Sequence, residues 1–171
     1  GLRLLSFITG GKQERARRSG TENAAAIAGM GVAARLAKGK MADEASRLAA
    51  LRNRLEERIL QSVPGTAING DPGTRVPNTS NISFDRVVAE SLLIALDLEG
   101  IAVSTGSACS SGTLEPSHVL KAMGLPAHRT QNSIRFSLGA VSTEADVDRV
   151  AAVLPGVVDK LRSLTRTPGR G

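Results

Sequence analysis

Apolar and polar positions recur along the chain with two periods, one helical and one of alternation, so we expect both helices and strands. Residues 24–61 carry the helical period and keep one apolar face, formed by Leu48, Leu51, Leu55 and Ile59. A break or bend is expected near Gly39, and one helix or two fit this stretch equally well. Further helices are predicted at residues 89–98, 116–123 and from Thr143 onward, where Asp146 completes a capping box.

Alternation predicts strands between these helices. The clearest are residues 79–84 and 133–138. Shorter strands are expected at residues 2–8, 66–69 and 101–103. The interleaved order indicates an α/β or α+β protein rather than a helical bundle or a β-sandwich.

Composition changes this picture little. With 171 residues and 41% hydrophobic side chains, we expect one compact domain with at most an appendage. The net charge of +6 raises nucleic-acid binding as a hypothesis. However, over residues 47–58 four arginines lie close to the acids Glu56 and Glu57, which predicts a solvated helix face. Aromatic residues are only 2% of the chain, too few to stack bases, so no nucleic-acid partner is expected.

The chain has a single cysteine, Cys109, which excludes an intrachain disulfide and any site built from several cysteines. No metal is predicted. A free thiol indicates a reducing compartment, and the cytoplasm is expected. Neither a signal peptide nor a membrane span is recognisable, so no membrane partner is expected. The start at Gly1 without Met suggests that an upstream part has been removed.

Cys109 lies in a run of small residues at 104–112 (STGSACSSG), which favours a mobile, accessible loop. A thiol there can move between a donor and an acceptor. A cysteine paired with His118 or His128 for acyl transfer stays open, although no motif supports it and both histidines are expected at the surface.

Arg135 occupies the centre of a predicted strand, on the face of Ser133 and Ser137. Its guanidinium suits a carboxylate, although an edge arginine with a solvated head explains it equally well. Thr21 follows the glycine-rich, basic segment 10–20 at a predicted helix start. Phosphate binding is plausible there, but N-capping alone would also explain the threonine.

Three segments in the same order resemble the NifS/IscS-like cysteine desulfurases of the class-V aminotransferase family. They are residues 10–23 (GGKQERARRSGTEN), 104–119 (STGSACSSGTLEPSHV) and 132–139 (NSIRFSLG). The resemblance implies the carboxy-terminal part of a fold-type-I pyridoxal-phosphate transferase, of mixed α/β class. Residues 1–42 would end the large cofactor domain, and residues 43–171 would form a small α+β domain.

The resemblance also implies roles for three residues. Cys109 would attack the sulfur of L-cysteine held by pyridoxal 5'-phosphate, leaving L-alanine and a Cys109 persulfide. Arg135 would bind the substrate carboxylate. Thr21 would bind the cofactor phosphate of the partner subunit in a homodimer. The sulfur would pass to an iron-sulfur scaffold or another acceptor protein.

Two departures from the family pattern are visible. Lys12 replaces a glycine of the usual triplet. The family's Schiff-base lysine, ring-stacking histidine and pyridine-binding aspartate lie upstream of the matched region, so the chain alone is expected to be inactive. A sulfur-carrier or scaffold-binding module without enzymatic activity, and a selenocysteine lyase, remain alternatives.

Overall fold

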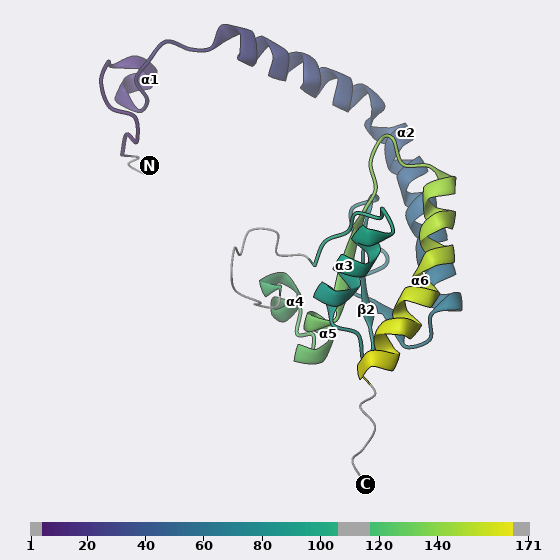
Figure 1. Ribbon diagram of the computed structural model, residues 1–171. Coiled ribbons are helices and arrows are strands. Elements are labelled where there is room, and N and C mark those ends of the chain that lie inside the picture. Colours follow the sequence, from purple (N-terminus) through teal and green to yellow (C-terminus); the bar gives the residue numbers. More distant parts are fainter. Residues whose placement is uncertain (1–4, 106–116, 166–171) are drawn as a thin grey trace. The chain divides into compact units, whose positions relative to one another are not determined.

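The structure is a computed structural model that describes residues 5–105 and 117–165 (Figure 1). The chain divides into two compact units, Gly1–Met41 and Ala42–Gly171. The boundary between them falls within one long helix. Each unit is described by itself.

Unit 1 contains a single turn, α1 (Gln13–Ala16), and the first part of α2 (Ala24–Ser62). The predicted break at Gly39 is absent, because one glycine costs a helix only about 1 kcal/mol and good helix formers surround it. The strand predicted at residues 2–8 is wrong for its described part: residues 5–8 form none. Leu5 and Phe7 are 89% and 99% exposed, so no burial within this chain holds them extended.

Unit 2 is built on a three-stranded antiparallel sheet in the order β1-β2-β3. The strands are β1 (Thr66–Ile68), β2 (Thr79–Phe84) and β3 (Ser133–Ser137), as the alternating pattern predicts. The second part of α2, α3 (Ala89–Leu98) and α6 (Glu144–Thr165) pack on one face (Figure 1). The core lies between them and includes Ile82, Phe84, Ile134 and Phe136.

The ends of α3 and α6 follow the sequence signals. Gly100 ends α3 with φ of +74°, and the N–H of Ile101 bonds the Leu96 carbonyl at 2.9 Å, which makes a Schellman motif. At the start of α6, the Asp146 carboxylate accepts from the Thr143 N–H at 2.8 Å, and the Thr143 hydroxyl accepts from the Asp146 N–H at 3.3 Å. The predicted capping box is therefore confirmed.

Two short helices directly precede β3 in the sequence. Ser117 caps α4 (His118–Ala122), one residue inside the predicted start at Pro116, which falls outside the described residues. Helix α5 (Ala127–Gln131) was not predicted, because Gly124 and Pro126 indicate a break. Pro126 instead precedes the first helical residue, where its missing N–H costs nothing.

The strand expected at residues 101–103 is also absent. Only the next residue, Ser104, pairs with β3, through a single bridge to Arg135. Residues 101–103 are positioned by the end of α3 instead, where the Ile101 N–H still bonds the helix.

The solvated helix face predicted at residues 47–58 is wrong in part, because Arg52 and Glu56 are only 7% and 5% exposed. Both side chains find partners in the loop between β1 and β2. The Glu56 carboxylate accepts two bonds from Arg75 and one from the Ser80 hydroxyl, and Arg52 donates to the Val76 carbonyl at 2.9 Å. The hydrogen bonds to Glu56 raise the pKa of Arg75, whereas burial, reinforced by Arg75, lowers the pKa of Arg52.

Removing the charge of Glu56 weakens the two hydrogen bonds that the half-buried Arg75 guanidinium donates to it. We therefore expect Glu56→Gln to lower the free energy of unfolding by roughly 1–3 kcal/mol in urea titrations. The control is Glu57→Gln, since Glu57 is exposed and bonds only Gln61; it should change stability by less than about 0.5 kcal/mol. Equal effects of the two variants would contradict a buried ion pair.

An ion pair also links α2 to α6. Arg54 binds Asp148 through two bonds of 3.0 Å each, and Arg58 approaches the same carboxylate at 3.2 Å. The hydrogen bonds from Arg54 lower the pKa of Asp148. Water reaches this pair, so its contribution to stability is small.

The sign of the pKa change sets the pH dependence of this contribution. Because the pKa of Asp148 is lower in the folded state, the ion pair stabilises the fold fully at pH values above the unfolded pKa of about 3.9. This stabilisation is lost as the pH falls through the lower pKa of the folded state. We expect Asp148→Asn to lower the melting temperature at pH 5–7, with the difference from the parent closing in acid. Asp159→Asn, at an exposed site on the same helix, should show no such closing difference. A constant difference between Asp148→Asn and the parent down to pH 2.5 would exclude the pair.

Candidate functional site

Arg135 lies on the sheet face away from the helical core. Its neighbours in β3, Ile134 and Phe136, are buried in the core, and strand alternation turns Arg135 to the opposite side. Its position in β3 matches the sequence prediction. The Nε atom of Arg135 is buried and has no hydrogen-bond partner among the described residues. Its Nη2 lies 3.4 Å from the Ser104 hydroxyl.

The backbone of Arg135 holds the start of the segment that carries Cys109. The Arg135 N–H donates to the Ser104 carbonyl at 2.6 Å, and the Ser104 N–H donates back at 3.1 Å. Cys109 itself lies outside the described residues, five positions after Ser104. The far end of the segment is fixed by Ser117, a buried N-cap.

A polar network covers the same sheet face beside Arg135. Asn69 donates to the Asn81 side chain at 2.6 Å and to the Ser133 hydroxyl at 2.8 Å, and it accepts from Arg129 at 2.6 Å. Asn81 pairs directly with Arg135 in the β2–β3 register. Sequence reasoning missed these residues. The sequence signal for this polar face is the alternation of polar and apolar side chains along β2.

Thr21 is not the N-cap that the sequence predicts. Helix α2 begins at Ala24, and the Asn23 side chain accepts from the Ala26 N–H at 3.0 Å. Asn23 is the N-cap because it lies directly before the first helical residue, Ala24. The exposed Thr21 hydroxyl has no hydrogen bond within the described residues, and it follows Gly20, whose φ is +96°. Capping therefore does not explain Thr21.

The residues of unit 1 fit a phosphate group. The Thr21 hydroxyl is exposed, and so are the cationic side chains of the preceding segment, Lys12, Arg15, Arg17 and Arg18. The Arg18 guanidinium folds back to the Gly20 carbonyl at 3.1 Å. The five lysines of the chain are all exposed. The exposed hydroxyl and cations of unit 1 are therefore compatible with the phosphate end of pyridoxal phosphate.

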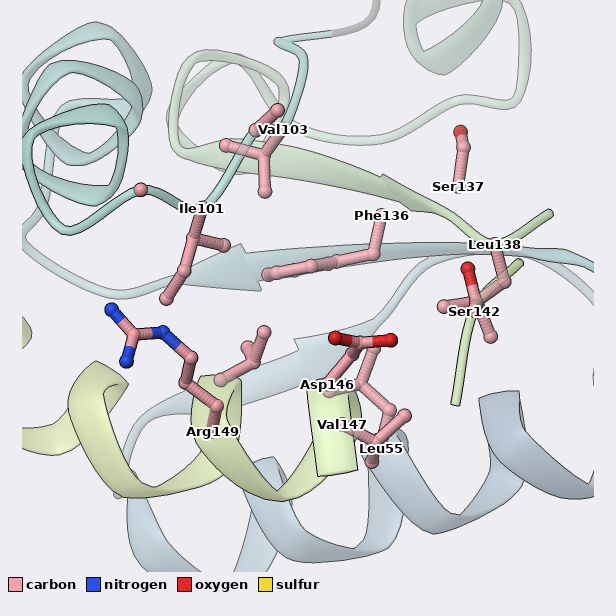
Figure 2. Close-up of a pocket in the computed structure, with 13 residues that line it drawn as sticks. Leu55, Ile101, Val103, Phe136, Ser137, Leu138, Ser142, Asp146, Val147 and Arg149 are labelled. Atoms are coloured by element: carbon pink, nitrogen blue, oxygen red, sulfur yellow. The ribbon is translucent and has the colours of Figure 1, made fainter. Parts of the chain in front are cut away.

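The two histidines and the pocket do not form a further site with Arg135 or Thr21 among the described residues. His118 and His128 are exposed, as predicted. No group of His, Cys, Asp and Glu side chains in the described ranges could hold a metal ion, and none of the described helices could span a membrane. A pocket of about 210 Å³ opens between residues 101–103, the end of β3 and α6 (Figure 2). Neither Arg135 nor Thr21 lines it.

Each unit thus contributes one candidate residue: Arg135 in unit 2, whose Nε is buried without a partner among the described residues, and Thr21 in unit 1, whose hydroxyl is exposed. A family model described as "Aminotransferase class-V" matches residues 6–150. The chain belongs to the class-V aminotransferase family. This family depends on pyridoxal phosphate, in keeping with the phosphate fit of unit 1.

Two relatives of this chain are named as cysteine desulfurases. The chain is 48% identical over 165 residues to the "Cysteine desulfurase" of Gluconacetobacter diazotrophicus and 47% identical to the "Cysteine desulfurase NifS" of Azotobacter vinelandii. Each match covers 96% of this chain and 41% of the relative. The chain thus spans about two fifths of their length. These matches confirm the resemblance predicted from the three segments.

A solved structure agrees on the fold. The NifS-like protein from Rickettsia africae aligns with a TM-score of 0.76 and 33% identity, over 92% of this chain and 41% of that structure. The prediction of a mixed α/β, carboxy-terminal part of this class-V aminotransferase fold is therefore confirmed.

The reassignment of the N-cap can be tested by local amide exchange. Asn23→Ala removes the acceptor for the Ala26 N–H, and losing a cap costs about 1 kcal/mol, so Ala26 should exchange about fivefold faster. Thr21→Val should leave that rate unchanged. The reverse order of effects would restore Thr21 as the cap.

Proposed function

We propose that this chain is part of a cysteine desulfurase, which removes sulfur from L-cysteine with pyridoxal 5'-phosphate. Its relatives carry that name, and three segments match the family in order. In this proposal residues 1–42 end the cofactor domain, and residues 43–171 form the small domain. The chain alone would be inactive, because the anchor for the cofactor ring would come from the remaining length that its relatives possess.

The observation that carries the proposal is the buried Nε of Arg135, which has no partner among the described residues and lies in the residue that pairs with Ser104 at the start of the cysteine segment. A buried Nε without a partner costs about 1–3 kcal/mol, more for a charged group. A carboxylate bound side-on would satisfy Nε and Nη2 together. The backbone pair with Ser104 then ties this carboxylate site to the segment carrying Cys109.

In the proposed reaction Cys109 is the nucleophile. The Cys109 thiolate bonds to the sulfur of L-cysteine while the carbon–sulfur bond breaks. The electron pair of that bond remains on carbon, which takes up a proton and gives L-alanine. The sulfur remains on Cys109 as a persulfide, so no external oxidant is needed. Pyridoxal phosphate would supply the electron sink that makes the substrate carbon reactive.

Unit 1 would complete a domain and bind phosphate. Its part of α2 exposes large apolar side chains, Ile27, Met30, Leu36 and Met41, which a complete domain would cover. Thr21 would bind the cofactor phosphate of the partner subunit in a homodimer. We further propose an iron-sulfur scaffold or another acceptor protein as the destination of the sulfur, in the cytoplasm.

The test joins this chain, in one reading frame, to the part of the Gluconacetobacter relative that it does not match. With pyridoxal phosphate, L-cysteine and a thiol reductant, the fusion should release sulfide, and mass spectrometry should find a persulfide on Cys109. Cys109→Ala should abolish both. Arg135→Gln should raise KM or lower kcat/KM roughly 10- to 150-fold, the worth of a hydrogen bond to a charged group.

Two controls keep the test specific. Ser110→Ala changes the residue beside Cys109 and should retain activity. Arg86→Gln removes an exposed arginine outside the site and should leave KM unchanged. Sulfide release by the Cys109→Ala fusion would refute the assignment, and faster turnover of L-selenocysteine than of L-cysteine would favour a lyase.

A further inference from the structure

Asn81 and Arg135 are direct neighbours on the polar face of the sheet, because they pair in the register of β2 and β3. The Asn81 carbonyl accepts from the Asn69 N–H on the β1 side at 2.8 Å, whereas the backbone of Arg135 bonds Ser104 on the opposite side. The two residues therefore form a non-hydrogen-bonded pair. In such pairs the side chains approach closely, with Cβ atoms about 4.5–5.5 Å apart.

A series of hydrogen bonds fixes the orientation of the Asn81 amide. It begins at Arg129, whose guanidinium only donates, so Asn69 presents its side-chain oxygen to it. The Nδ2 group of Asn69 then faces two acceptors, the Ser133 hydroxyl and the Oδ1 atom of Asn81. Ser133 accepts because its own proton goes to the Arg129 carbonyl. Asn81 is thereby held with its oxygen toward Asn69.

Arg129, which lies in α5, is itself anchored. Its guanidinium also donates to the Ser83 hydroxyl in β2 and to the Ile68 carbonyl in β1, each at 3.3 Å. With the bond to Asn69 at 2.6 Å, these contacts hold the guanidinium against both strands. The orientation of the Asn81 amide is thus set by the packing of α5 on the sheet.

The result is two hydrogen-bond donors side by side, with no acceptor between them among the described residues. The Asn81 Nδ2 group donates to no described residue, and neither does the buried Nε of Arg135. The two side chains cannot satisfy each other, because a guanidinium has no acceptor and the oxygen of Asn81 is taken by Asn69. A buried donor without a partner calls for an explanation, and a bound anion supplies the missing acceptor.

We propose that Asn81 is a second ligand for the carboxylate that Arg135 binds. The guanidinium takes the carboxylate side-on through Nε and Nη2, and the Asn81 Nδ2 group donates a third hydrogen bond. An ionised carboxylate has about four acceptor sites, so it can take all three bonds. Asn69 and Arg129 are positioning residues that act through the Asn81 amide. That this carboxylate is the one of L-cysteine rests on the proposed function, whereas the two-residue site does not.

Titration of the full chain with a carboxylate tests the proposal without the desulfurase reaction. The probe is sodium acetate, compared with sodium chloride at equal ionic strength, and NMR follows the side-chain N–H signals of Asn81 and Arg135. Both signals should shift with one apparent Kd. Asn81→Ala should raise the Kd seen at Arg135 about 10-fold, the lower end for a hydrogen bond to a charged group. Thr79→Ala, on the same face of β2 but paired with Ser137, should leave the Kd unchanged.

Asn69→Asp tests the orientation of the amide. The variant keeps the shape of the side chain and the acceptor for Arg129, but presents an oxygen instead of Nδ2 to Asn81. Asn81 should then turn its nitrogen to Asn69→Asp and its oxygen to the carboxylate, so the Kd should rise at least as much as in Asn81→Ala. The added charge acts in any background, whereas the amide acts only where Asn81 is present. The effect of Asn69→Asp should therefore be at least about fivefold smaller in the Asn81→Ala background.

Asn81→Asp gives an independent readout. Its carboxylate still accepts from Asn69 and lies beside Arg135, so this variant supplies the missing acceptor within the chain. Without acetate, its Arg135 Nε–H signal should lie near the position that acetate produces in the parent chain. Added acetate should then move this signal little.

Four results would overturn all or part of the proposal. Acetate that shifts neither signal, or an unchanged Kd in Asn81→Ala, would exclude the two-residue site. Tighter binding of inorganic phosphate than of acetate would assign the site to another class of anion. An equal effect of Asn69→Asp in both backgrounds would remove Asn69 and Arg129 as positioning residues.

The fusion used to test the proposed function separates that function from this inference. In the fusion, Asn81→Ala should raise the KM for L-cysteine about 10-fold, as it raises the Kd for acetate. A chain that binds acetate through both residues while the fusion releases no sulfide would refute the proposed function and leave the carboxylate site standing. Sulfide release by the fusion without any acetate shift in the chain would refute this inference alone.

Discussion

The pairing of β2 with β3 is the constraint on which unit 2 depends. Its register places Ile82 beside Ile134, and alternation sends both into the core beneath α2, α3 and α6. The same register places Asn81 beside Arg135 on the opposite face. A shift by one residue would bury the arginine in the core and expose the apolar residues, so core packing and the candidate site are fixed by the same interaction.

The polar face is stabilised by hydrogen bonds, whereas the other face is stabilised by apolar burial. Asn69 joins three elements by bonding Asn81, Ser133 and Arg129, and this network reaches the strand of Arg135. Arg135 differs from Asn69, because its Nε is buried and has no partner among the described residues. That contrast, together with the Ser104 bridge, is what directs the functional proposal to this end of the sheet.

The two units differ in how many of their apolar and polar side chains find partners within this chain. Unit 2 has a closed core and an ion pair between the buried Glu56 and the half-buried Arg75. Unit 1 exposes large apolar residues along α2, and its Thr21 hydroxyl has no hydrogen bond among the described residues.

Local sequence determined the elements whose signals are local. The alternation of β2 and β3, the capping box of α6 and the glycine that ends α3 each depend on residues a few positions apart, and all were predicted. The three motifs likewise identified the family. Tertiary structure decided the rest. The burial of Arg52 and Glu56 depends on the β1–β2 loop, and the pairing of Ser104 depends on a strand 31 residues away. Such contacts arise from the way distant segments pack, and no local period in the chain encodes them.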